Sequence, residues 1–366
     1  MFPYLIIFLI AAILFYSLPQ KRSGLVTVYL MVFIGLVGFR DMIGGFDVYI
    51  YSEVYEVLIG KDLFTYPYFE KGYLVYYYIL QLISERREFM FFVTAVIMTL
   101  LHFKSIKKHS PHLGMSLFIY FCKFFLFSFV YLRQGLAMGI IWLSISFLIN
   151  KKYWYVALFA TLAFMFHKSS MIFIPFLFIA HRKFNNLQLG FIAFLIIFIS
   201  LTPLGDMLLG FIGDVSESQK FSAYASRSGG VNIFYLLEGG IGIYLAILFQ
   251  KYFYHNRNTT VIFNGFFMYS LTILAGLTNA TFIRFSWYYF IFVVLALPYI
   301  YYFYRYQNYA FKPLFKNLLF IYYAMVFFRL LILYDGGDFM PYKSIFQDFD
   351  RGGMWEFMEY RKDYLK

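Results

Sequence analysis

The sequence predicts an all-α, polytopic integral membrane protein, and three observations lead to this prediction. Of the 366 residues, 62% are apolar or aromatic and only 14% are charged, whereas a soluble domain has about 25% charged residues. Apolar stretches recur along the chain without the strand-period alternation of an outer-membrane barrel. Backbone groups in lipid must be paired internally, so these stretches are helices. A disulfide scaffold is excluded, because Cys122 is the single cysteine.

The apolar stretches predict about 12 transmembrane helices. One crossing of the ~30 Å hydrocarbon core needs roughly 20 mostly apolar helical residues. The predicted spans are Phe2–Leu18, Gly24–Phe39, Phe89–His102, Leu113–Val130, Gln134–Ile149, Tyr153–Phe166, Met171–Ala180, Leu187–Pro203, Val231–Gln250, Val261–Asn279, Phe285–Phe303 and Asn317–Leu333. The pair between Tyr153 and Ala180 is short, which is typical of a tight hairpin or of two broken helices. The shorter segment Gly72–Ser84 predicts a re-entrant or interfacial helix, because charged residues follow it at once.

The distribution of basic residues predicts the orientation. The net charge is +12. In a membrane protein an excess of lysine and arginine marks cytoplasmic loops, so no nucleic-acid partner is needed to explain it. Six basic loops share one side if Gly72–Ser84 does not cross: Lys21–Arg22, Lys104–Lys108, Lys151–Lys152, Arg182–Lys183, Lys251–Arg257 and Arg305–Lys316. We therefore expect a single transmembrane helical domain over residues 1–346, external loops at 40–88 and 205–230, and a polar tail over 347–366.

Residues with recognisable chemistry gather on the other, external side. The second span runs into F-R-D-M-I-G-G-F-D-V-Y-I-Y, in which Arg40 is followed by the acids Asp41 and Asp47 and by Tyr51. Arginine is a rigid five-donor fork suited to phosphate or carboxylate. Arg40 therefore predicts an anion contact, unless it pairs with one of the two acids and only closes the loop.

Glu70 and Arg133 are two further candidates. Glu70 opens the predicted short helix in Y-F-E-K-G-Y, where a carboxylate is either a helix cap stabilised by the dipole or a catalytic group. Arg133 stands between two apolar runs in Y-L-R-Q-G-L-A-M-G. An arginine at the membrane edge indicates a functional site, here for an anion, with Gln134 beside it. Gly135 and Gly139 predict close helix packing.

His167 lies between the two short predicted spans in F-H-K-S-S, next to Lys168. A histidine can take a proton from an attacking hydroxyl near neutral pH, but a single histidine can equally be a hydrogen-bonded structural residue. Arg227, Arg284 and Lys343 are basic residues of other external segments. No residues have metal-ligand spacing, and no nucleotide-binding fingerprint or H-E-x-x-H motif occurs. We expect neither a metal nor a cofactor.

These motifs, in this order and spacing, resemble the EpsG family of polytopic proteins, which are similar to Wzy-type polysaccharide polymerases. The resemblance covers about Gly35 to Phe346 and includes F-I-R-F around Arg284 and P-Y-K-S around Lys343. It implies a glycosyltransferase of the bacterial inner membrane that joins repeat units of an O-antigen, capsule or exopolysaccharide at the outer face. The implied donor is an undecaprenyl-diphosphate-linked oligosaccharide in the lipid bilayer, and the implied further partners are a chain-length regulator and a flippase.

That activity gives each candidate residue an expected role. The transfer needs cations at the leaving diphosphate and a base for the acceptor hydroxyl. The expected base is His167 or Glu70, and Asp47 would orient an arginine or a sugar hydroxyl. The expected substrate-binding residues are Arg40, Arg133, Arg284, Arg227, Gln134, Lys168, Tyr51 and Lys343. We expect the arginines and the imidazole to converge in one external pocket.

Two other function classes would use some of the same residues. Another lipid-linked glycan transferase, such as a ligase or a GT-C-like glycosyltransferase, needs the same charges. A glycan flippase or transporter would instead need polar groups along a full crossing path, with pairs near the bilayer middle. The clustering of charges near one face favours transfer chemistry over transport.

Overall fold

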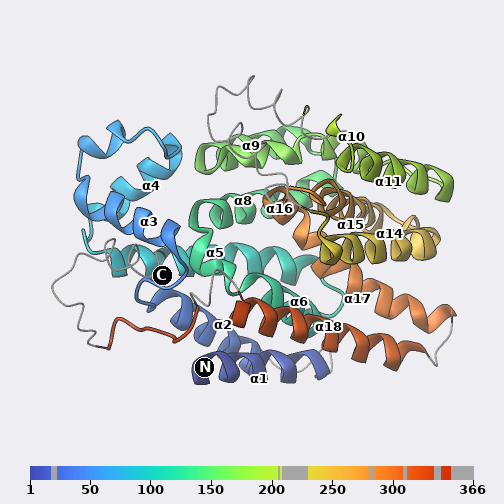
Figure 1. Cartoon of the computed structure of the whole chain (residues 1–366), viewed down its shortest axis with the longest axis horizontal. Coiled ribbons are helices and arrows are strands. Elements are labelled where there is room, and N and C mark those ends of the chain that lie inside the picture. The colour runs from blue at the N-terminus through green and yellow to red at the C-terminus, as the bar shows by residue number, and fades with distance from the viewer. Residues whose placement is uncertain are drawn as a thin grey trace. The chain divides into compact units, whose positions relative to one another are not determined.

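The computed structural model describes residues 1–17, 23–204, 207, 230–279, 283–307, 311–333 and 339–347, and the regular structure within them is helical (Figure 1). The chain divides into two compact units. Unit 1 comprises Met1–Leu143, Thr161–Lys168 and Asn308–Lys366, and unit 2 comprises Ser144–Ala160 and Ser169–Gln307. We predicted one helical domain over residues 1–346, and the apolar composition contained no sign of two units.

Unit 1 contains the N-terminal helices and the last one. They are α1 (Phe2–Tyr16), α2 (Ser23–Gly38), α3 (Phe46–Val57), the 3-10 helix η1 (Asp62–Thr65), α4 (Lys71–Gln81), α5 (Arg87–His109), α6 (Leu113–Phe124), α7 (Phe127–Val130) and α18 (Phe311–Leu333). Two further helices, α8 (Leu132–Ile149) and α9 (Tyr153–Phe166), have residues in both units. Helix α1 packs against α2 and α6, α2 packs against α5, and α18 packs against α6.

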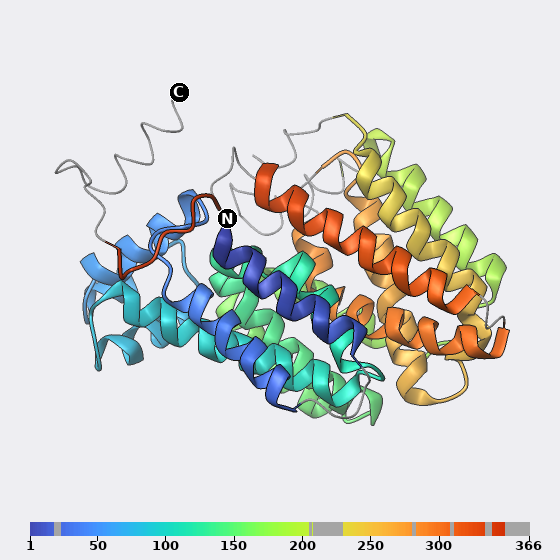
Figure 2. The ribbon, with the colours of Figure 1, turned by 90° about the horizontal axis from the view of Figure 1, so that it is seen from below.

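Aromatic side chains fill the space between α1, α6 and α18. Phe8 of α1 stacks on Phe327 of α18 with the ring centroids 5.6 Å apart. Phe118 of α6 stacks on Phe320 of α18 at 4.9 Å. Figure 2 shows α1 and α18 running side by side. Helices in lipid associate through close packing, because the lipid tails are as apolar as the side chains. The large rings supply that packing here.

Unit 2 is organised around α15 (Arg257–Ala275), which packs against α11 (Asn186–Ser200), α14 (Ile233–Phe253) and α17 (Phe290–Gln307). The side chains of Asn185, Asn232 and Asn256 cap α11, α14 and α15 by accepting hydrogen bonds from backbone N–H groups of the first turn. The remaining short elements of the unit are α10 (Phe176–Ile179), α16 (Ile283–Ser286) and the 3-10 helix η4 (Trp287–Tyr289).

Five helical stretches of the described residues are long and apolar enough to cross a membrane: Arg87–His109, Leu132–Ile149, Ile233–Phe253, Ile283–Tyr304 and Phe311–Leu333. Helices α14 and α18 turn apolar side chains outward, and Ile241 of α14 and Met325 of α18 are 53% and 59% exposed. Such a surface would be a liability in water but matches lipid tails. The chain is therefore a multi-pass membrane protein.

The predicted spans all overlap helices, and the short stretch Met171–Ala180 is broken, which is one of the two alternatives that the sequence left open. Met171–Ala180 does not form one regular α-helix: the chain makes the 3-10 helix η2 (Lys168–Phe173), a turn and the short α10. Pro175 interrupts this segment, because proline lacks an N–H group and its ring clashes with the preceding turn. Helix α4 replaces the predicted Gly72–Ser84 helix; its 11 residues rise only about 16 Å, less than the ~30 Å core.

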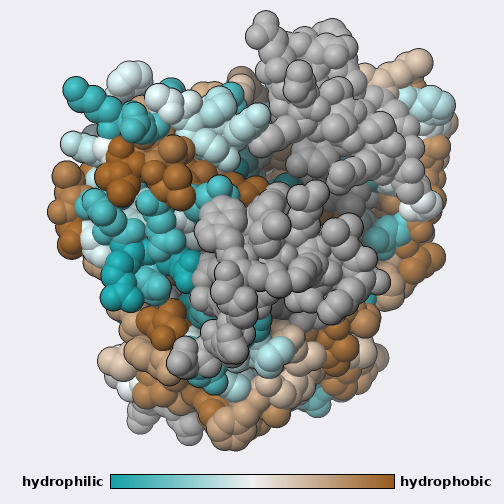
Figure 3. Space-filling view, turned by 60° about the vertical axis from the view of Figure 1, so that its left-hand side comes forward, coloured by the Kyte–Doolittle hydropathy of each residue, from teal (hydrophilic) through white to brown (hydrophobic). Residues whose placement is uncertain are grey.

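The α3–α4 layer, which we define as residues 46–81, lies against one end of α5. The sequence analysis did not predict α3, because acids and tyrosines break its apolar pattern. Figure 3 brings this side of the molecule forward and shows teal hydrophilic residues gathered beside brown hydrophobic ones. That mixture is typical of a surface at the membrane–water boundary.

Candidate functional site

The candidate site begins with Glu70, the residue that precedes α4. Its backbone is extended and its carbonyl oxygen accepts the N–H groups of Tyr73 and Leu74, so the main chain starts the helix in the usual way. Its carboxylate makes no capping bond to that helix. The side chain is therefore not the simple helix cap that the sequence left open, and its oxygens bind groups from other parts of the chain.

Three groups surround the Glu70 carboxylate. Arg133 Nη1, on α8, donates to Oε2 at 2.6 Å. His167 Nδ1, just after α9, lies 3.0 Å from Oε1, and the backbone N–H of Lys168 donates to the same oxygen at 3.1 Å. All four residues belong to unit 1. The structure thus brings to Glu70 groups that lie 63 to 98 residues further along the chain.

The Glu70 carboxyl group is ionised at neutral pH. Burial raises its pKa, but the hydrogen bond from His167, the charge of Arg133 and the Lys168 N–H outweigh burial and lower the pKa to about 2. An ionised carboxylate can only accept hydrogen bonds, so His167 Nδ1 must carry a proton. In the neutral imidazole the lone pair is then on Nε2. The carboxylate thus fixes the tautomer in which a histidine acts as a base through Nε2.

Arg133 is held in place by the α3–α4 layer. Its Nη1 also donates to the carbonyl oxygen of Tyr68 at 3.2 Å, and its Nε donates to the hydroxyl of Tyr51 at 3.4 Å. The guanidinium carbon lies 4.3 Å from the ring centroid of Phe69, in cation–π contact. Among the described residues, none bonds to the other terminal nitrogen, Nη2. That nitrogen is the donor that an anionic ligand could use.

Close helix contacts fix the two sides of this cluster. A side chain at Gly72 of α4 would place its Cβ 2.6 Å from Cβ and 2.7 Å from the carbonyl oxygen of Met165 in α9, so glycine is required for this approach. Gly139 of α8 likewise faces Leu101 of α5, where a Cβ would lie 2.8 Å from that of Leu101. The predicted close packing of the glycine face of α8 is confirmed.

A model of the EpsG family matches residues 23–344 of the chain. The chain belongs to the EpsG family. EpsG-family membrane proteins are linked to exopolysaccharide synthesis, and the matched region contains all of the Glu70 cluster. It also agrees with the resemblance that the motifs indicated over Gly35 to Phe346. No curated protein and no solved structure matches the chain.

Arg40 has a structural position in this EpsG-family chain. Its side chain is fully buried and donates from Nη1 to the carbonyl oxygen of Val37 at 2.5 Å and from Nη2 to that of Phe129 at 2.7 Å. Its guanidinium carbon lies 4.2 Å from the ring centroid of Phe91. Arg40 therefore joins the end of α2 to α7 and α5. The expected substrate contact of Arg40 stays a prediction; in this structure two carbonyl groups of unit 1 accept hydrogen bonds from its guanidinium.

The sequence analysis did not single out two polar residues of α5 that make tertiary contacts. Arg87, at the start of α5, has its guanidinium 3.9 Å from Asp41 and 3.7 Å from Glu56. Asp41, which the sequence offered as a partner for Arg40, therefore pairs with Arg87. His102 lies in the same helix, where its ring nitrogens contact the Tyr120 hydroxyl at 2.8 Å and the Gly135 carbonyl oxygen at 2.9 Å. The sequence signal was present in both cases, a charge at a helix start and a histidine within an apolar run.

The other predicted site residues of the EpsG-family chain lie in several places. Tyr51 and Lys168 join the Glu70 cluster, the second through its backbone. Asp47 lies in the first turn of α3, Gln134 is buried on α8, and the carbonyl oxygen of Lys343 accepts the Asp41 N–H. Arg284 is exposed on α16 of unit 2, and Arg227 lies outside the described residues. In the described part of the chain, no group of three or more His, Cys, Asp or Glu could hold a metal.

Proposed function

We propose that the protein is a polysaccharide polymerase that joins undecaprenyl-diphosphate-linked oligosaccharide repeat units at the outer face of the bacterial inner membrane. One observation supports this most strongly: a buried carboxylate holds an imidazole and a guanidinium within hydrogen-bond distance of its two oxygens. Family membership supports the link to polysaccharide synthesis. The donor already contains the energy of its diphosphate ester, so the reaction uses no nucleotide.

The proposed reaction is glycosyl transfer to a hydroxyl. The acceptor hydroxyl oxygen forms a bond to the anomeric carbon of the donor glycan, and the bond from that carbon to the diphosphate oxygen breaks with its electron pair on the diphosphate. His167 Nε2 takes the hydroxyl proton, and Glu70 stabilises the imidazolium that forms, as an aspartate does in hydrolase triads. With a pKa of about 2, Glu70 itself is too weak a base.

Arg133 is the proposed cation for the leaving diphosphate. Its Nη1 and Nε donate to Glu70, Tyr68 and Tyr51. These hydrogen bonds hold the guanidinium, and therefore Nη2, in one orientation. A pre-oriented guanidinium stabilises charge that develops in the transition state at little reorganisation cost. Lys168, Lys343, Arg284 and Arg227 are proposed as further anion contacts, and Asp47, Gln134 and Tyr51 as groups that orient side chains or sugar hydroxyls.

The orientation of α5 supports an external site. Arg87 begins this helix and contacts Asp41 and Glu56 beside the α3–α4 layer, whereas Lys107 and Lys108 lie in its last turn. Its 23 residues rise about 34 Å, enough to cross the core. Since lysines mark cytoplasmic ends, the Glu70 cluster then lies on the outer side, where lipid-linked repeat units are joined. A flippase and a chain-length regulator are the proposed partners.

The test compares His167→Ala and Arg133→Ala in cells that make the polymer, at equal membrane abundance. We expect both variants to leave only single repeat units on lipid, while Arg86→Gln, at an exposed arginine that is paired with Glu88, gives full-length chains. Glycan chain length on a gel is the measurement. Full-length polymer from both alanine variants would reject the proposed site, and unattached full-length polymer would indicate a ligase instead.

A further inference from the structure

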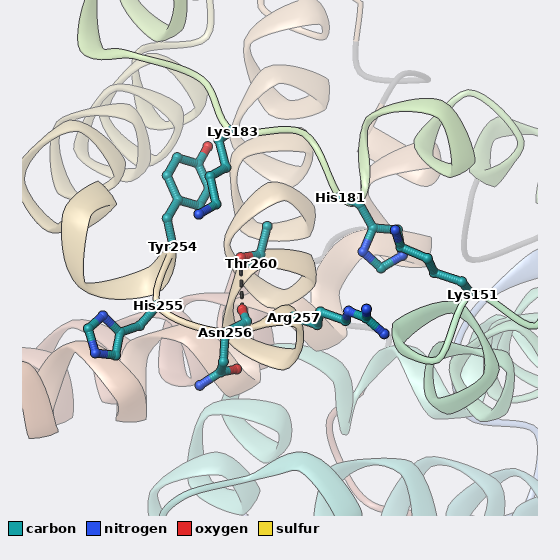
Figure 4. A pocket seen from close by; sticks show the side chains of 8 residues that line it. All are labelled: Lys151, His181, Lys183, Tyr254, His255, Asn256, Arg257 and Thr260. Carbon is teal, nitrogen blue, oxygen red and sulfur yellow. Dashed lines mark hydrogen bonds between the residues drawn. The ribbon is translucent and has the colours of Figure 1, made fainter.

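Unit 2 contains a second polar site, a cavity of about 230 Å³ between the loops at one end of its helices. Its lining is formed by Lys151, His181, Lys183, Tyr254, His255, Asn256, Arg257 and Thr260 (Figure 4). The residues come from the loops before α9, before α11 and between α14 and α15, and from the first turn of α15, which contributes Arg257 and Thr260. A single water molecule needs only about 10–15 Å³ of such volume, so the cavity has room for a phosphate group.

The charge of this cavity has one sign. Three lining residues, Lys151, Lys183 and Arg257, are cations at neutral pH, two others are histidines, and no acid lines the cavity among the described residues. Figure 4 shows the Arg257 guanidinium extending toward Lys151 and His181, while Lys183 lies beside Tyr254. Arg257 is also the first residue of α15, where the helix dipole favours an anion.

Buried polar groups hold the walls of the cavity. Asn264 is fully buried on α15, and its Nδ2 donates to the carbonyl oxygens of Ile179 and Arg182 at 2.8 Å each. The Tyr254 hydroxyl donates to Asn264 Oδ1 at 3.2 Å and accepts the Phe184 N–H at 3.0 Å. The loop that presents His181 and Lys183 is therefore fixed from both sides. Holding several positive side chains close together costs free energy, because like charges repel. An anionic ligand would offset this repulsion.

His181 connects this loop to the next one. Its Nε2 lies 2.9 Å from the carbonyl oxygen of Leu148, and a carbonyl oxygen can only accept, so Nε2 carries the proton. The Leu148 end of α8 leads directly into Lys151. Thr260 and Asn256 complete the floor, with the Thr260 hydroxyl donating to the Asn256 carbonyl oxygen at 2.8 Å. Three of the six basic loops that we assigned to the cytoplasmic side thus meet at one cavity.

We propose that this cavity binds a phosphate group at the cytoplasmic face, supplied by the phosphodiester of an anionic phospholipid or by a soluble phosphate compound. Basic pockets between membrane helices on this side recognise such headgroups. This site is separate in residues and in unit from the Glu70 cluster, and the proposal does not depend on the polymerase function.

The experiment measures binding to the purified full-length protein in detergent. The probes are dioctanoyl phosphatidylglycerol, inorganic phosphate and, as the neutral reference, dioctanoyl phosphatidylcholine. The variants are Lys183→Gln, Arg257→Gln and their combination. Matched controls are Lys152→Gln and Arg182→Gln, which remove the same charge from the same loops but do not line the cavity. Thermal unfolding of each variant establishes that it is folded.

We expect phosphatidylglycerol to bind more tightly than phosphatidylcholine, and the double variant to weaken this binding about ten-fold, with less than about two-fold change in the controls. If inorganic phosphate binds with the same dependence on Lys183 and Arg257 and phosphatidylglycerol does not, the source is a soluble phosphate. Absence of binding by both anionic probes would overturn the proposal. So would equal losses in the lining variants and the controls, because net charge alone would then explain the binding.

Discussion

The Glu70 cluster of unit 1 and the basic cavity of unit 2 both gather cationic and imidazole groups, but only the first contains a carboxylate. Glu70 fixes the guanidinium of Arg133 and selects the tautomer of His167. In the cavity, Lys151, Lys183 and Arg257 line the wall, and no acid is among the described lining residues. A single carboxylate can therefore convert a group of donors into an oriented acid–base site, whereas a group of cations without one is suited to bind an anion.

Loss of the proposed base should affect polymerisation far more than loss of a cation in the basic cavity. His167→Ala removes the proposed base and should lower the polymerisation rate by about 10²- to 10⁴-fold, whereas Lys183→Gln in the basic cavity should leave it within about two-fold. The measurement is the rate of chain extension by purified protein with a defined lipid-linked repeat unit. Equal losses in the two variants would show that the distinction between the two regions is wrong.

A smaller effect is expected from Glu70→Gln, which keeps the shape of the side chain and removes its charge. The base stays in place but loses the group that orients it, so the rate should fall by roughly 10- to 100-fold. Glu70→Asp, which restores the charge at a shorter reach, should recover part of the rate in the same assay. If Glu70→Gln were as active as the parent chain, the carboxylate would have only a packing role.

The charge of Glu70 should also be visible in stability against pH. Its pKa is lowered to about 2 in the folded protein, so folding gains stability above the unfolded pKa near 4.5 and loses it as pH falls toward 2. The contribution is at most about 3 kcal/mol. Thermal unfolding in detergent between pH 6 and pH 3 should show a steeper loss in the parent chain than in Glu70→Gln. Parallel curves would contradict the ion pairing.

The smallest expected effect tests the helix approach that builds the site. Gly72→Ala would force a Cβ against Met165, and we expect a destabilisation of about 1–3 kcal/mol together with reduced polymerisation. Gly35→Ala is the matched control, because a Cβ there meets nothing within 4 Å, and it should be neutral or slightly stabilising. Thermal unfolding measures both. A neutral Gly72→Ala would mean that α4 and α9 can separate without cost.

Much of the site was predictable from residue type, and its arrangement was not. Glu70, Arg133 and His167 are polar residues at the ends of apolar segments, where a charge is costly without a use, and this marks them in the sequence. Arg40 carries the same signal, yet it is buried against carbonyl groups. The hydropathy pattern shows that a charge lies in an apolar region, but it does not show which group binds that charge. The sequence therefore could not distinguish Arg133, which binds a carboxylate, from Arg40, which binds carbonyl groups.

The amino-acid sequence by itself determined the helical, membrane-embedded character of this protein and its family, since apolar runs in lipid have no alternative to internal hydrogen bonding. Helix breaks such as that at Pro175 are also local. Only the tertiary structure decided that Glu70 meets His167, 97 residues away, that Arg87 rather than Arg40 pairs with Asp41, and that three basic loops enclose one cavity. These outcomes depend on which helices pack together. A small residue such as Gly72 permits close packing, but the helix that packs against it is distant in the chain and cannot be identified from the local sequence.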